Sequence, residues 1–103
     1  MRRLSIPDLT NGLASAVPGH RAGTGGVALS AGGERSHPEG RHVHEFPEAF
    51  LILDGHGDIE IDGHASPIAA GDVLVVAPGE DHHLVSSVHR PLVIVWLHLR
   101  AAE

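Results

Sequence analysis

From Val27 onward, short apolar runs alternate with clusters of glycine, proline and aspartate, and none of the runs is long enough for a helix. Many short runs bounded by turn-forming residues predict an all-β fold, a small antiparallel sandwich or barrel. The last run, LVIVWLHL, is apolar on both faces, as a strand buried between two sheets would be. The expected strands are 27–30, 41–44, 49–53, 58–61, 66–69, 72–76, 82–85 and 92–99.

The residues between the runs predict particular turns. Asp62 and Gly63 suit a tight hairpin, because the two central residues of such a turn need positive φ angles. The sequence DGHG at 54–57 predicts a second one. Pro47 has no backbone donor and restricts the residue before it, so we expect the chain to turn between His44 and Glu48.

The first 26 residues have a different pattern. The sequence SIPDLTNGLAS predicts either a short helix that starts at Ser5 or Asp8 or a segment packed on the barrel rim. The sequence AGTGG from Ala22 indicates a flexible connection. We therefore expect an N-terminal segment, 1–26, that forms a partly ordered arm or rim, followed by a barrel domain, 27–103.

Composition narrows the class of protein. A chain of 103 residues with 42% hydrophobic and 19% charged residues is typical of one globular domain. A formal charge of -6 and seven scattered arginines argue against a nucleic-acid partner. The chain has neither an apolar run that could span a membrane nor the apolar core of a secretory signal, so we expect a cytoplasmic protein without a membrane partner. Without cysteine, any metal must be held by nitrogen and oxygen donors.

The ten histidines include two clusters, HVHEFPE at 42–48 and DHH at 81–83. Alternate residues of a strand lie on one face about 6 to 7 Å apart, so His42 and His44 could converge on one ion. Glu48 could direct its carboxylate to the same point, and His82 or His83 could supply a fourth donor. An HxH pattern alone is weak evidence in a chain so rich in histidine, but the glutamate and the second cluster strengthen it.

These residues resemble the two sequence motifs of the cupin superfamily. HVHEFPE, six further residues and Gly55 are similar to the first motif, which is HxH, three or four residues, Glu, six residues and Gly. Gly71, five residues and APGEDH, which ends at His82, are similar to the second, Gly, five residues and PxGxxH, with Ala77 in place of its first proline. The resemblance covers about Val27 to Leu99.

The resemblance implies a jelly-roll barrel, also called a double-stranded β-helix, in which four side chains bind one divalent transition metal: Fe, Mn, Ni, Co, Cu or Zn. The implied ligands are His42, His44, Glu48 and His82. His83 would then point to the opposite face, toward a dimer interface or solvent. A homodimer is also expected from the family, and the apolar last strand favours one because a partner would cover its second face.

The function implied by this ligand set is a metal-dependent enzyme of the dioxygenase, isomerase or lyase type, with a small oxygenated organic molecule as its substrate. Glu48 could leave the metal and act as a base, or His98 could transfer the proton. The absence of tyrosine argues against the sugar-epimerase branch. The alternatives are a non-catalytic, metal-dependent module that binds or senses a small molecule, and a structural barrel whose site stays empty.

Several other side chains have two interpretations. Trp96 and His98 share a face of the last predicted strand and either line a cavity or pack on a partner subunit. Phe50 is either a cavity wall or ordinary core. We expect His37 at the surface, with a lid over the barrel mouth as the alternative. Solvated charges are expected at the predicted hairpin ends: Asp58, Glu60, Asp62 and Asp81.

Overall fold

The computed structural model describes residues 1–102, and nearly all of its regular secondary structure is β-strand. A 3-10 helix, η1 (Ile6–Leu9), and one turn of α-helix, α1 (Leu13–Ala16), precede most of the strands. Within the described residues, no helix has the length and apolar character needed to cross a membrane. The strands are β1 (Arg2–Ser5), β2 (His20–Leu29), β3 (Glu48–Asp54), β4 (His56–Ile61), β5 (His64–Ala69), β6 (Asp72–Val76), β7 (His82–Ser86) and β8 (Val93–Ala101).

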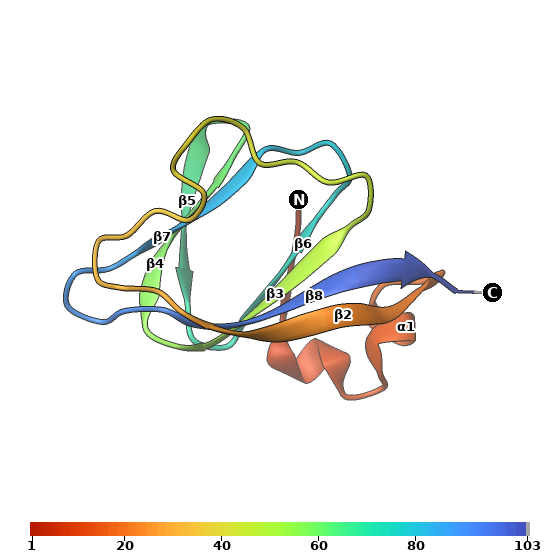
Figure 1. Cartoon of the computed structure of the whole chain (residues 1–103). Coiled ribbons are helices and arrows are strands. Elements are labelled where there is room, and N and C mark those ends of the chain that lie inside the picture. The colour runs from red at the N-terminus through yellow and green to blue at the C-terminus, as the bar shows by residue number, and fades with distance from the viewer. Residues whose placement is uncertain (103) are drawn as a thin grey trace.

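The strands form two antiparallel sheets that face each other (Figure 1). One sheet has five strands in the order β1-β6-β3-β8-β2, and the other has three in the order β5-β4-β7. The predicted all-β jelly roll is therefore confirmed. The hairpin predicted at Asp62 and Gly63 is present, because these residues join β4 to β5 with φ angles of 48° and 83°. The hairpin predicted at 54–57 is wrong, because this turn connects β3 to β4, which belong to different sheets.

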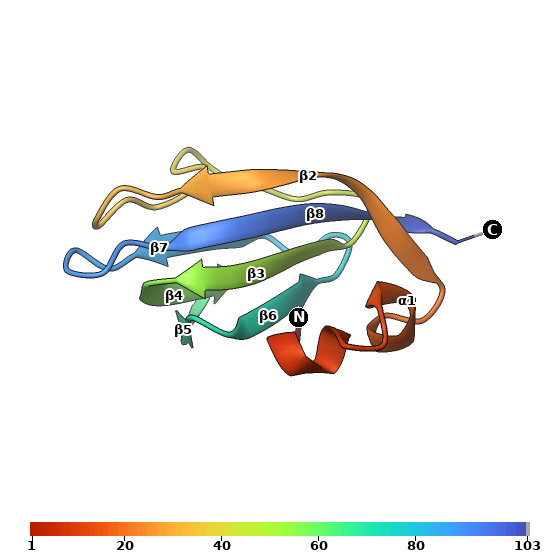
Figure 2. The same ribbon diagram turned by 90° about the horizontal axis from the view of Figure 1, so that it is seen from below.

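The main core lies between the two sheets, and strand alternation explains its composition. Phe50 and Ile52 on β3, Leu74 on β6, Ile59 on β4 and Ile94 on β8 are buried together. The N-terminal helical turns lie on the face of the five-stranded sheet that points away from the other sheet (Figure 1), and Figure 2 shows them from that side. A second buried cluster lies there: Ala16, Val17, Ala49, Val75 and Leu99.

Part of the five-stranded sheet remains exposed. Val27 and Leu29 on the edge strand β2 are 65% and 78% exposed, and Leu53 on β3 is 48% exposed. β8 lies between these two strands, and exposed apolar side chains on one sheet are the kind of surface that a second subunit covers. The predicted homodimer stays a prediction.

The prediction of a strand at 41–44 is wrong. These residues are irregular and lie beside the chain that enters β7, where the His82 amide donates to the His42 carbonyl at 3.1 Å and the Gly79 amide donates to the His44 carbonyl at 2.9 Å. Gly40, with a φ of 74°, and Pro47, without an amide proton, bracket the segment and prevent a continuous ladder of hydrogen bonds.

The N-terminal residues extend the same sheet. β1 pairs with β6, and the 3-10 helix begins directly after Ser5, whose amide donates to the Asp8 carboxylate at 2.8 Å. The expected helix start at Ser5 is thus confirmed. The prediction of a flexible connection at 22–26 is wrong, because these residues belong to β2. This strand continues without a break past the expected boundary between residues 26 and 27. Glycine is needed there for close packing: a Cβ atom on Gly25 would lie 2.7 Å from the Trp96 carbonyl oxygen.

Candidate metal centre

Three chain segments bring four potential metal ligands together at one end of the barrel. Glu48 is the first residue of β3 and His82 is the first residue of β7, while His42 and His44 lie in the irregular segment before β3. Their donor atoms all lie within 4.8 Å of one another. Metal–donor bonds of about 2.1 Å allow at most about 4.2 Å between any two donors, so the donors would have to move closer together to share one ion.

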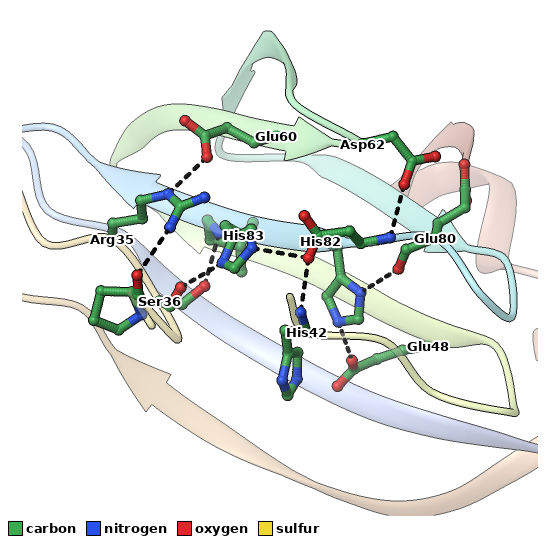
Figure 3. Close-up of polar contacts among 12 residues, drawn as sticks. Arg35, Ser36, His42, Glu48, Glu60, Asp62, Glu80, His82 and His83 are labelled. Atoms are coloured by element: carbon green, nitrogen blue, oxygen red, sulfur yellow. Dashed lines mark hydrogen bonds and ion pairs between the residues drawn. The ribbon is translucent and has the colours of Figure 1, made fainter. Parts of the chain in front are cut away.

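The carboxylate of Glu48 is at the centre of the group. Its Oε1 atom lies 3.0 Å from Nε2 of His82 and 3.2 Å from Nε2 of His44. Its Oε2 atom lies 3.3 Å from Nε2 of His98. Nδ1 of His82 donates to the Glu80 carbonyl at 3.0 Å, which orients the ring so that Nε2 faces Glu48 (Figure 3). A second partner of this kind is what fixes the orientation of metal-binding imidazoles.

Burial and hydrogen bonding shift the pKa values of His82 and Glu48 in opposite directions. Burial disfavours the charge on His82, but hydrogen bonds to Glu48 and Glu80 outweigh it and raise the pKa of His82 above 6.5. Burial also disfavours the charge on Glu48, but the hydrogen bond from His82 and the neighbouring imidazoles lower the pKa of Glu48. Without metal, the two groups therefore form an ion pair, in which a proton occupies the Nε2 position that a metal would take.

The pairing of His82 predicts its titration in metal-free protein. A raised pKa in the folded state means that the ion pair stabilises the fold fully below pH 6.5 and that this contribution is lost as the pH rises through the raised pKa. We expect the His82 ring, followed by NMR after treatment with a chelator, to titrate above pH 6.5. A midpoint below 6.5 would contradict the ion pair.

His42 and His44 are held in their neutral, metal-binding form. Burial, together with the nearby rings of His37 and His82, lowers the pKa of His42 to about 4. Burial also lowers the pKa of His44, although Glu48 opposes the shift. Within residues 1–102, Nε2 of His44 is the one buried side-chain polar atom with no partner in hydrogen-bond geometry, and its contact with Oε1 of Glu48 at 3.2 Å is an ion pair only when His44 is protonated. Buried polar atoms are almost always satisfied, so this unpaired nitrogen fits a bound cation.

A cavity of about 380 Å³ extends from this group of ligands into the barrel. Trp96 and His98 both line it, which decides between the two interpretations of that face of β8. Phe50 lines it too, while it also packs in the core. Glu48 and His98 are direct partners in the pairing of β3 with β8, so the register of the sheet places His98 beside the carboxylate.

His37 is a cavity residue to which the sequence analysis gave too little weight. It is exposed to solvent, as expected, but it also lines the cavity, where its ring stacks on His42 with 3.5 Å between centroids and 10° between planes. Its φ of 46° lies in the left-handed region, which is uncommon for a residue with a side chain. The loop before the ligand segment therefore does reach the barrel mouth.

His83 and Asp81 hold this part of the chain from behind the cavity. His83 is 1% exposed, with Nδ1 at 2.8 Å from the Ser36 carbonyl and Nε2 at 2.9 Å from Oδ1 of Asp81. The same Asp81 oxygen accepts from the His42 amide at 2.7 Å (Figure 3). The expectation that His83 faces solvent or a dimer interface is wrong, because the loop around Ser36 covers it. Asp81 was expected to be solvated, and instead it fixes the backbone of a predicted ligand.

Glu60 is partly buried and ion-paired, contrary to the expectation of a solvated charge, whereas Asp62 is exposed as expected and also accepts a hydrogen bond. Arg35 pairs with Glu60 at 2.7 Å, and the Asp62 carboxylate accepts from the Asp81 amide at 3.0 Å (Figure 3). Both contacts join the loop regions to the three-stranded sheet, on the side of β7 away from Glu48.

Fold and site together define a small antiparallel barrel protein with a cluster of three histidines and a glutamate that could hold a metal ion at one end of its cavity. Residues 27–98 match the family model for the cupin domain, and the chain belongs to this family. No protein of curated function matches the sequence.

Solved structures show the same fold. A cupin protein from Bacteroides fragilis is 23% identical, with a TM-score of 0.69 over 99% of this chain and 79% of that one. A cupin 2 conserved barrel domain protein from Salinispora arenicola is 27% identical, with a TM-score of 0.63 over 72% of this chain and 60% of that one. A Photorhabdus luminescens protein is 20% identical, with a TM-score of 0.65 over 72% of this chain and 59% of that one. The present chain thus matches about three fifths of the length of the last two proteins.

Proposed function

We propose that the protein binds one divalent transition metal through His42, His44, Glu48 and His82 and uses it as an enzyme on a small oxygenated organic molecule. The observation that carries the proposal is Nε2 of His44, which is buried without a partner in hydrogen-bond geometry and lies beside the same carboxylate oxygen as Nε2 of His82. Three imidazoles and one carboxylate suit Fe, Mn, Ni, Co, Cu or Zn, and these donors do not select one of them.

The bound metal would supply a Lewis acid able to polarise a carbonyl or enolate oxygen. Side chains of the cavity would accept and transfer the substrate proton. Glu48 presents one carboxylate oxygen to His44 and His82 and the other to His98, so it can accept a proton on the side of the cavity where His98 lies. His98 can hold or return that proton at Oε2 of Glu48, while Phe50 and Trp96 form apolar walls of the cavity.

The test is the metal content of protein purified without added metal, compared with that of two variants. We expect about one equivalent in the wild type and a loss of most of it in His42→Ala, which removes one of four donors. His89→Ala is the matched control, because His89 is exposed and lies in the loop between β7 and β8. Unchanged metal content in His42→Ala would mean that metal binds elsewhere among the other nine histidines, and would overturn the proposal.

The second candidate is a non-catalytic module that binds or senses a small molecule. It is favoured by the small number of titratable cavity residues beyond the four ligands, which in the described chain are His37 and His98. A small molecule that raises the melting temperature of the metal-loaded protein and is recovered unchanged after prolonged incubation would support the module. Conversion of the molecule by the wild type, with slower conversion by His98→Gln, would support the enzyme.

A further inference from the structure

The cavity has two ends of different chemistry. The polar end consists of the four ligand side chains with His37 and His98. The apolar end begins immediately beside it: the ring of Trp96 lies 5.0 Å from that of His98, and the ring of Phe50 lies 5.8 Å from that of His82. Ile94, Leu84 and Ala28 complete the apolar walls.

The apolar end offers little to a polar or charged molecule. Across residues 1–102, no arginine, lysine, asparagine or glutamine lines the cavity. Two serines line it, and one acceptor site on the Ser36 hydroxyl is taken by the Leu84 amide at 2.8 Å. A polyol or a second carboxylate placed between Phe50 and Trp96 would lose its hydration with little more than two serine hydroxyls to replace it, which is unfavourable.

The position of Trp96 is set by a glycine on the neighbouring strand. Gly26 is the direct partner of Trp96 in the pairing of β2 with β8. A Cβ atom on Gly26 would lie 3.1 Å from the indole ring, so a larger residue there would displace the ring. The barrel thus keeps space for a large aromatic wall beside the polar end, and flat aromatic walls pack best against a ring or another compact apolar group.

We propose that the site takes a small amphipathic molecule, with one oxygen-bearing end directed at the His–Glu cluster and an apolar, ring-sized body between Phe50, Ile94 and Trp96. The inference rests on the proposed function, because the oxygen-bearing end is the one that a metal would bind. A cavity of about 380 Å³ admits a body of this size. Sugars, phosphorylated compounds and small dicarboxylates do not fit this division of the cavity.

The experiment uses three 2-hydroxy acids that share one chelating end and differ in the body. Mandelate carries a phenyl ring, glycerate a hydroxymethyl group and malate a second carboxylate. Trp96 is the only tryptophan and the chain has no tyrosine, so tryptophan fluorescence reports from the cavity wall itself. We expect metal-loaded protein to bind mandelate at least tenfold more tightly than either of the other two acids.

Two variants on one strand locate the apolar body. Ala28→Leu fills the apolar end, and we expect it to weaken mandelate binding at least tenfold while metal content stays at the wild-type level. Val27→Leu is the matched control, because Val27 is 65% exposed and does not line the cavity. Equal affinities for the three acids, binding of none of them, or unchanged mandelate affinity in Ala28→Leu would overturn the inference. Metal content, measured separately, shows whether the proposed metal centre fails as well.

Discussion

Glu48→Gln is expected to weaken metal binding by about two to three orders of magnitude while the barrel stays folded. Four-ligand zinc sites contribute about 10 to 16 kcal/mol, so one of four donors is worth about 2.5 to 4 kcal/mol, or about 100- to 1000-fold in affinity. Glu48 is also the only carboxylate among the four candidate ligands. Glutamine keeps the shape, and its amide can still donate to a neutral imidazole, so the side chain need not leave the cluster.

The measurement is competition for the metal against a chromophoric chelator, with circular dichroism to verify the fold of the metal-free variant. Glu39→Gln is the control, because it makes the same chemical change at an exposed position. The variant should also lower the pKa of His82, which its hydrogen bond with Glu48 raises. Wild-type affinity in Glu48→Gln would remove Glu48 from the ligand set and leave it as a partner of His82 alone.

The sequence was sufficient to predict the strands that carry Glu48, His82 and His98. These strands are short apolar runs whose alternation is fixed by burial of one face, and a shift by one residue would expose Phe50 and Ile52. The cupin-like motifs then placed His82, and not His83, beside Glu48. The pattern of apolar residues and the spacing of the motifs lead to the same placement of His82, because both depend on the alternation of side chains along a strand.

The conformation of the His42–His44 segment could not be predicted in this way. The two rings reach one cluster without strand geometry, because hydrogen bonds from the His82 and Gly79 amides and to the Asp81 carboxylate hold their backbone. These contacts join residues about 35 to 40 positions apart in the chain, so a pattern of neighbouring residues cannot predict them. The same limit applies to His37, whose approach to His42 depends on the loop fold, and to His83, which the Ser36 loop covers.

Gly55→Ala is expected to destabilise the protein by about 2 to 5 kcal/mol, through two separate effects. Gly55 has a φ of 80°, and a side chain in that conformation costs about 1 to 2 kcal/mol. An added Cβ would also collide with the Pro91 carbonyl and lie 2.7 Å from the Arg90 carbonyl oxygen. The Arg90 carbonyl accepts the His56 amide at 3.0 Å, so the loop cannot retreat without losing that bond, and overpacking of this kind costs about 1 to 3 kcal/mol.

Gly63→Ala separates the two effects. Gly63 has a φ of 83°, but an added Cβ there would meet nothing within 4 Å, so only the backbone cost of about 1 to 2 kcal/mol applies. Urea unfolding of both variants in the metal-free state should show the larger loss in Gly55→Ala, by about 1 to 3 kcal/mol. Equal losses of unfolding free energy in the two variants would mean that the loop at 90–91 moves away from the added Cβ at no cost. The glycine that ends the first motif would then serve the backbone turn alone, and not the close approach of the β3–β4 turn to the chain entering β8.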